Sequence, residues 1–313
     1  MSAPDPVNDP ATDPLAFDPP CGIAEEIAPG LRRLLAPNPS PMTFRGTNTY
    51  LLGHGAVAVI DPGPALPAHR DAILAALGPG ERVSHILVTH SHLDHSPLAR
   101  PLAAATGAPV LAYGPSDAGR SDVMARLAAA GDLGGGEGVD TAFRPDALLA
   151  DGARVAGDGW ELEALWTPGH FGNHLCFAWG DAVFTGDLVM GWATSLVSPP
   201  DGDLGAFMAS LDRLAARGAS VLYPGHGAPV TQPAARIAEL IAHRRGREAQ
   251  ILAALADGPA ATADLTRRIY TEVPAALLPA AERNVFAHLI DLTERNVVSP
   301  EGRLSVSAVF RRL

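Results

Sequence analysis

A short run of metal-ligand residues constrains this chain more than any other feature of its sequence. Three histidines and one aspartate directly follow the apolar residues 86–88, in the order Thr89-His90-Ser91-His92-Leu93-Asp94-His95. Side chains alternate along an extended backbone, so His90 and His92 point the same way, whereas Asp94 and His95 come where the chain must turn. Two imidazoles for one metal, with a carboxylate and an imidazole for its neighbour, are what a two-metal hydrolytic centre needs. The run therefore predicts two metal ions at the end of a strand.

Three later segments place further ligand-type residues where predicted strands end. Each combines glycine with a histidine or an aspartate: Thr167-Pro168-Gly169-His170, Phe184-Thr185-Gly186-Asp187 and Pro224-Gly225-His226-Gly227. Glycine allows the tight turn by which a backbone approaches a metal-bound substrate. Each segment alone is more typical of an ordinary turn. In this order after the histidine run, they predict His170, Asp187 and His226 as the remaining ligands.

Composition indicates a globular protein and excludes several function classes. The 313 residues are 47% apolar and 18% charged, which is typical of a soluble chain with one large core or two domains. A net charge of −11 argues against a protein that coats nucleic acid with a broad basic surface. The two cysteines, Cys21 and Cys176, imply no disulfide framework, so a cytoplasmic location is expected. No apolar run approaches the roughly 20 residues of a membrane span, so no membrane partner is expected.

Three parts of the chain differ in character. Residues 1–20 are rich in proline and aspartate, resemble no signal peptide, and are expected to form a disordered tail. Residues 21–243 mix hairpins with strand–helix units, which predicts an α/β layered fold. Strands are expected within 49–61 and at 85–89, 109–113, 162–166, 174–179, 182–184 and 221–223. Helices are expected at 68–77, 98–106, 121–130, 204–216 and 232–243, with a mobile glycine-rich loop at 131–138.

Residues 244–313 form the third part, which is predicted to be helical and then hairpin-like. Helices are expected at 248–256, 262–269 and 278–296, and the last places Val285, Leu289 and Leu292 on one stripe. A short hairpin with a turn at 300–302 follows. Three helices and a hairpin are the layout of a winged helix. This part carries ten arginines and eight acidic residues, so it is less acidic than the rest of the chain.

With these motifs in place, the chain resembles the metallo-β-lactamase superfamily over about residues 25–240. The resemblance implies an αββα sandwich of two mixed sheets. It implies one zinc ion on His90, His92 and His170, and a second on Asp94, His95 and His226, with Asp187 bridging. A site of histidines and aspartates also accepts manganese or iron. Asp61, in Ile60-Asp61-Pro62-Gly63, matches the acidic turn of the family and would orient ligands, with a simple strand-ending Asx turn as the alternative.

The resemblance also implies a metal-dependent hydrolase that attacks with a hydroxide held between two metals. Asp94 is placed to take or return a proton. His174 either faces the cleft and hydrogen-bonds a substrate oxygen or merely begins a strand, and the polar residues before it favour the cleft. Phe171 stands where related sequences often have a small hydroxyl residue, and is expected to reshape the cleft mouth. Phe171 and Asn173 are therefore the candidate substrate contacts.

The substrate depends on the C-terminal part. Residues 46–51, 247–252 and 280–289 resemble the lactamase-like protein 2 group, which includes single-stranded RNA endonucleases. A phosphodiester, with single-stranded RNA as the partner, is therefore the first prediction. Arginines along the RNA path would be required, although a solvated helix surface explains them equally well; the candidates are Arg244, Arg245, Arg247, Arg267, Arg268 and Arg283.

Two alternatives remain open on the sequence. The first is a hydrolase of small esters, thioesters or lactones, similar to glyoxalase II, in which the C-terminal helices only wall the pocket. The second is a regulator that binds DNA through the winged helix and senses metal, although a complete two-metal ligand set exceeds what sensing requires. A basic groove that runs to the C-terminal domain would favour RNA, whereas a closed apolar pocket would favour the small ester.

Overall fold

The computed structural model describes residues 14–131, 133, 138–272, 274 and 278–313. Part of the expected tail is ordered, since Pro14–Ala16 form the short 3-10 helix η2. The Phe17 ring is buried and lies 4.6 Å from the Arg33 guanidinium. The rest of that tail, and most of the glycine-rich loop expected at 131–138, fall outside the described residues. Among those described, no helix is both long and apolar enough to cross a membrane.

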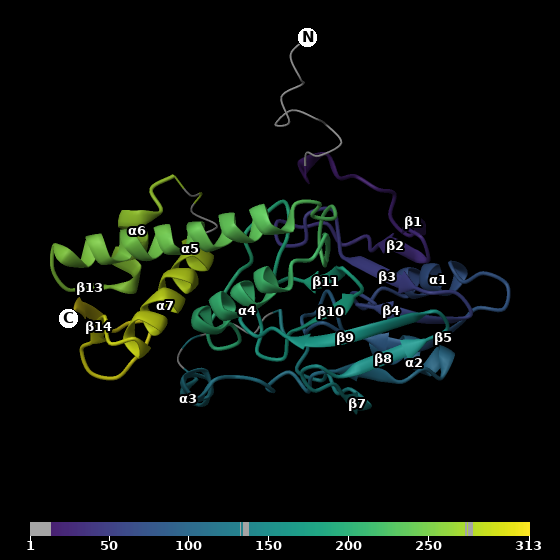
Figure 1. Cartoon of the computed structure of the whole chain (residues 1–313). Coiled ribbons are helices and arrows are strands. Elements are labelled where there is room, and N and C mark those ends of the chain that lie inside the picture. The colour runs from purple at the N-terminus through teal and green to yellow at the C-terminus, as the bar shows by residue number, and fades with distance from the viewer. Residues whose placement is uncertain (1–13, 132, 134–137, 273, 275–277) are drawn as a thin grey trace, which may run out of the picture.

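The first sheet has seven strands that pair in chain order (Figure 1). They are β1 (Glu25–Ala28), β2 (Leu31–Leu35), β3 (Asn48–Leu52), β4 (Ala56–Ile60), β5 (Arg82–Leu87), β6 (Val110–Ala112) and β7 (Ala147–Leu148). Strands β1 to β4 are antiparallel, and β4 to β7 are parallel. Two helices, α1 (Pro67–Ala75) and α2 (Ala99–Thr106), pack Ile73 and Leu102 against the outer side of β4 and β5.

The second sheet has five strands in the order β12-β11-β10-β9-β8. They are β8 (Arg154–Gly157), β9 (Trp160–Trp166), β10 (Leu175–Trp179), β11 (Ala182–Gly186) and β12 (Val221–Pro224). Helices α4 (Leu204–Arg217) and α5 (Pro233–Ala256) cover its outer face through an apolar cluster that contains Phe207 and Leu240. The inner faces of the two sheets meet around Tyr50, Phe177 and Phe184. This arrangement confirms the predicted αββα sandwich.

The C-terminal unit lies at one end of the sandwich (Figure 1). It contains β13 (Ala260–Ala261), α6 (Thr262–Ile269), α7 (Leu278–Glu294), β14 (Val298–Pro300) and β15 (Val309–Arg312). The strands form a small sheet in the order β13-β15-β14. Its core joins Phe286 and Phe310 to Ile251 and Leu255 from the end of α5, and to residues of α3 (Asp122–Ala130). The layout is that of a winged helix, as predicted.

One helix crosses the boundary that the sequence places between residues 243 and 244. Two helices were expected, at 232–243 and 248–256, but α5 is a single helix of 24 residues. Arg244 and Ile251 are buried on it: Arg244 lies over Phe207 of the sandwich and also bonds to Asn284 of α7, and Ile251 packs in the C-terminal core. Tertiary packing of this kind outweighs the roughly 1 kcal/mol cost of the internal Gly246. The two units are therefore joined by a shared helix at this point.

A substitution at Gly246 tests the continuity of α5. A Cβ atom added there meets open space, so Gly246→Ala should raise the free energy of unfolding by about 0.5–1 kcal/mol. Chemical denaturation measures the change. Gly80→Ala is the matched control, because its Cβ also meets open space but its φ of +82° disfavours alanine and should lower stability. A stability loss in Gly246→Ala would contradict the continuous helix.

Candidate metal centre

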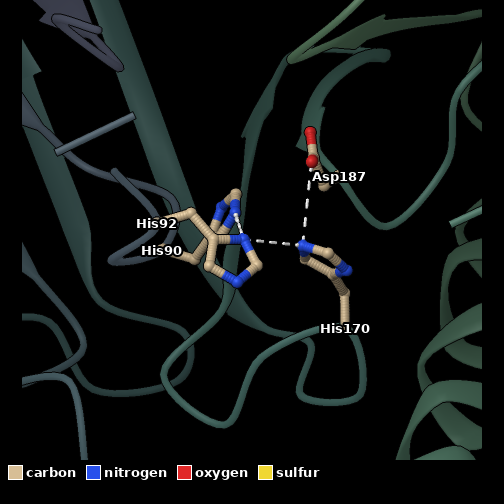
Figure 2. A group of neighbouring side chains, drawn as sticks. All are labelled: His90, His92, His170 and Asp187. Atoms are coloured by element: carbon tan, nitrogen blue, oxygen red, sulfur yellow. Dashed lines mark hydrogen bonds and ion pairs between the residues drawn. The ribbon is translucent and has the colours of Figure 1, made fainter. Parts of the chain in front are cut away.

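The four ligand-bearing segments meet at one edge of the sandwich, and their ligand atoms form two clusters. In the part of the chain that the structure describes, one cluster holds His90, His92, His170 and Asp187 (Figure 2), and the other holds Asp94, His95 and His226. In the first cluster, His92 Nδ1 lies 2.9 Å from His90 Nε2 and 3.0 Å from His170 Nε2. Asp187 Oδ2 lies 3.7 Å from His170 Nε2.

The second cluster adjoins the first through the carboxylate of Asp187. His95 Nε2 and His226 Nε2 are 3.3 Å apart, and Asp94 Oδ2 lies 3.1 Å from His226 Nε2. Asp187 Oδ1 lies 3.5 Å from His95 Nε2, and Asp187 Oδ2 lies 3.4 Å from His226 Nε2. Asp187 thus contacts ligand atoms of both clusters, which is the place of a bridging carboxylate.

The donor atoms fit metal ions in both spacing and chemistry. Ligand atoms about 2.0–2.1 Å from a tetrahedral ion lie about 3.3 Å from one another, which is close to the separations seen here. Asp187 Oδ1 is buried and accepts no hydrogen bond from the residues described. A buried carboxylate oxygen without a donor is costly unless a cation compensates it. Histidine and aspartate donors in these positions therefore constitute a site for two metal ions.

Hydrogen bonds on the far side of the rings fix which nitrogen faces the clusters. His170 Nδ1 lies 2.6 Å from the carbonyl oxygen of Leu196, and His226 Nδ1 lies 3.1 Å from that of Gly46. A carbonyl oxygen only accepts, so both Nδ1 atoms must carry the proton. The lone pair on Nε2 is then directed at the cluster, as metal ligation requires.

Asp61 supports the ligand run from below through three hydrogen bonds. Its Oδ1 accepts from the Thr89 backbone N–H at 2.7 Å, and its Oδ2 accepts from the Thr89 hydroxyl at 2.8 Å. His95 Nδ1 donates to the same Oδ2 at 2.9 Å. The Thr89 oxygen is left to accept from His90 Nδ1 at 3.0 Å. Asp61 thus orients His95 directly and His90 through Thr89. Of the two roles considered from the sequence, a ligand-orienting residue and a simple Asx turn, these contacts match the first.

Burial and charge divide the histidines into two electrostatic classes. Burial lowers the pKa of His92 to about 3 and holds the pKa of His90 well below its usual value. These imidazoles are neutral and available as ligands. Burial also opposes charge on His95 and His226, but carboxylates outweigh it: Asp94 and Asp187 raise the pKa of His95 well above its usual value, and Asp187 raises that of His226 to about 9. The acidic half of the site therefore attracts positive charge, which a metal ion supplies when it replaces the proton.

Three predicted site residues lie behind the ligands and not on the cavity wall. His174 is fully buried, and its Nδ1 contacts the Thr167 hydroxyl at 3.0 Å. Phe171 is also buried, with its ring 4.8 Å from that of His92. The Asn173 amide donates to the Ser91 hydroxyl at 3.0 Å. The expected cleft-facing His174 and the expected substrate contacts of Phe171 and Asn173 are corrected, because this loop turns its side chains into the protein.

A cavity of about 520 Å³ opens above the metal ligands. Its floor includes His92, Asp94, His170 and Asp187. Its walls are largely apolar and come from loops: Pro41, Met42, Leu93, Val139, Met190, Trp192, Ala193 and Leu196. Trp192 stacks on Phe44 with ring centroids 4.9 Å apart. The sequence motifs did not point to these wall residues, because irregular loops carry no periodic signal.

Comparison with known families agrees with this fold and site. The model of the metallo-beta-lactamase superfamily matches residues 42–226, and that of the beta-lactamase associated winged helix domain matches residues 261–305. Together with the clusters of histidines and aspartates, the matches define a metallo-beta-lactamase fold with a site for two metal ions. The chain belongs to the metallo-beta-lactamase superfamily.

Several proteins are similar to this chain over most of its length. A lactamase-like protein, adaB, of Aspergillus niger is 34% identical over 74% of this chain, which spans 65% of that relative. An atrochrysone carboxyl ACP thioesterase of Aspergillus fumigatus is 30% identical over 80% of this chain and 76% of its own length. A beta-lactamase-like protein 2 homolog of Caenorhabditis elegans is 31% identical over 88% of both chains.

Solved structures extend the agreement to both units. A metallo-beta-lactamase family protein from Thermus thermophilus has a TM-score of 0.73 and 28% identity, and the match covers 92% of this chain and all of that one. A beta-lactamase domain protein from Burkholderia ambifaria has a TM-score of 0.79 at 24% identity over 97% of this chain and 96% of its own. The second likeness shows the fold alone.

The structure predicts that Asp61 controls metal affinity. Asp61→Asn keeps an oxygen for the Thr89 N–H but turns an amide N–H₂ toward His95 Nδ1, which is itself a donor. Metal affinity should fall about 10–100-fold, as for other residues that orient a ligand. Competition with a chromogenic chelator measures it, and circular dichroism checks the fold. Wild-type affinity in a folded Asp61→Asn variant would contradict the orienting role.

The two clusters predict two metal ions per chain. His92→Ala should lower the metal content toward one ion per chain and abolish turnover, because it removes a nitrogen that faces two other ligands. Elemental analysis after dialysis measures the content. His54→Ala is the control, because His54 is an exposed histidine bonded to Glu81 away from the site. Two ions retained by His92→Ala would overturn the assignment of this cluster.

Proposed function

We propose that this protein hydrolyses a carboxylic ester or thioester that carries an apolar acyl group. The apolar wall of the cavity above the metal ligands carries this proposal. A volume of about 520 Å³ suits a small molecule, and an apolar lining with a few polar groups is typical of such sites. We further propose zinc as the native metal, because imidazole-rich tetrahedral sites suit it.

The chemistry follows from the groups at the cavity floor. Metal ions held here would polarise the carbonyl oxygen of the substrate and lower the pKa of water. The Asp94 side chain is 26% exposed, whereas that of Asp187 is 9% exposed. Asp94 is therefore the ligand carboxylate more open to the cavity. Burial opposes its ionisation, but His95 and His226 hold its pKa below the usual range. Asp94 is thus a carboxylate that can accept a proton from attacking water and return it to the leaving group.

Relatives support this substrate class. The similar protein from Aspergillus fumigatus is a carboxyl ACP thioesterase, and a second thioesterase of that type, from Paecilomyces divaricatus, is 33% identical over 76% of this chain. Hydrolysis of a thioester and of an ester both require attack on a carbonyl carbon. The same floor of the cavity therefore serves either substrate.

A phosphodiester, such as single-stranded RNA, is the second candidate, and one residue favours it. Arg283 of α7 lines the cavity and could contact a phosphate. The other candidate arginines do not line it. Arg244 is buried over Phe207, the Arg247 guanidinium lies 3.9 Å from the Tyr270 ring centroid, and Arg267 bonds to Asp264. One arginine offers little affinity for the phosphate backbone of RNA, so we favour the ester or thioester. A complete two-metal ligand set exceeds what metal sensing requires, so we disfavour the metal-sensing regulator.

A substrate panel separates the two candidates. Metal-loaded protein should hydrolyse thioesters with aromatic or branched acyl groups and leave a single-stranded RNA oligonucleotide intact. Trp192→Ala should lower kcat/KM for the apolar thioester about tenfold or more, since it removes an aromatic wall worth roughly 1.5–3 kcal/mol. An acetyl thioester, which is too small to reach the wall, should be less affected. RNA cleavage without thioester hydrolysis would reverse the assignment.

A further inference from the structure

The loop of residues 188–198 separates the metal ligands from the C-terminal helices. Met190, Trp192 and Leu196 on this loop line the cavity. The carbonyl of Leu196 accepts the Nδ1 proton of His170 at 2.6 Å. The position of this one carbonyl therefore determines how the imidazole of His170 presents Nε2 to the first cluster.

Side chains of helices α5 and α7 form hydrogen bonds to Ser195 and Val197, the residues on either side of Leu196 in the chain. Arg244 of α5 donates from Nη2 to the carbonyl oxygen of Ser195. Asn284 of α7 accepts from the backbone N–H of Val197 at 3.4 Å. The same Asn284 oxygen accepts from Arg244 Nη1 at 3.2 Å, so the two side chains act together. Arg244 is only 4% exposed, and a buried guanidinium is tolerated only where acceptors satisfy it.

Arg244 also reaches the other flank of His170 through Phe207. Its guanidinium lies 5.2 Å from the centre of the Phe207 ring. Phe207 packs tightly on Gly169, where an added Cβ would come within 2.2 Å of the Phe207 Cα. Gly169 precedes His170 in the chain. The backbone before the ligand and the carbonyl behind its ring are thus both fixed by groups that contact Arg244.

We infer that Arg244 and Asn284 are positioning residues for the metal ligand His170. The C-terminal unit would then complete the metal centre of the sandwich as well as wall its cavity. The effect acts through hydrogen bonds to loop carbonyls and amides, so it should follow the donor and acceptor character of the two side chains and not their volume alone. It does not depend on which substrate the enzyme hydrolyses.

Paired variants at each position test this inference on metal binding. Arg244→Met keeps a long apolar stem but removes the donor, whereas Arg244→Lys keeps a cationic donor. Asn284→Leu removes the acceptor for Val197 N–H, whereas Asn284→Asp keeps it. Arg244→Met and Asn284→Leu should lower the affinity for one of the two zinc ions about 10–100-fold, as measured by chelator competition. The lysine and aspartate variants should recover part of that loss.

A salt-bridge variant supplies the structural control. Arg295, directly after α7, binds Glu248 of α5 at 2.6 Å and Asp291 of α7 at 3.0 Å, so Arg295→Met loosens the same two helices without touching the loop. It should retain both ions. Cobalt-substituted protein adds a second readout, because the absorption bands of one ion should shift in Arg244→Met. If Arg244→Met fails to fold, Asn284→Leu decides. Wild-type zinc affinity in the folded variants, or an equal loss in Arg295→Met, would overturn the inference.

Discussion

The metal centre depends on one buried carboxylate that joins the ends of two parallel strands. Asp61 follows β4 and Thr89 follows β5, and the two are bonded through both the backbone and the side chain of Thr89. Because β4 and β5 are parallel, their ends lie side by side, and the carboxylate reaches the next strand without a long excursion. Asp61 has a φ of +50°, which asparagine and aspartate tolerate better than most residues. The contacts of Asp61 and Thr89 therefore fix the orientation of His90 and His95.

The same buried region binds metal because its charges do not balance internally. Asp94 and Asp187 are held ionised beside imidazoles that burial keeps neutral in one cluster and carboxylates protonate in the other. Protons on His95 and His226 compensate only part of this buried negative charge. Two cations would also compensate the Asp187 oxygen that has no hydrogen-bond donor. Metal binding to the folded state alone also adds to stability by mass action. Folding and loading of the site are therefore thermodynamically linked.

The sequence predicts the ligands better than it predicts their surroundings. The ligand positions follow strand ends, and strands such as β9 show their alternation in the order of residues. Strands β1, β7 and β8 were missed because they are short, and two of the three carry no buried residue. Strand β2 was missed because Arg32 and Arg33 interrupt its apolar residues. The direction of His174 was also missed, because a loop side chain points where tertiary contacts place it. The continuity of α5 depends on packing on both sides of Gly246, which local composition does not contain.

The loop of residues 188–198 connects the cavity wall to the C-terminal unit. Arg236 of α5 donates to the carbonyls of Met190 and Ala193, so the backbone that presents the cavity wall is held by the same helix that holds Ser195. Apolar side chains of the loop line the cavity, and its backbone carries the acceptor for His170. Changes in α5 or α7 can therefore alter the cavity wall while every metal ligand stays the same. The fold of the sandwich alone does not set a substrate, so the proposed function places part of that choice in the contacts between these helices and the loop.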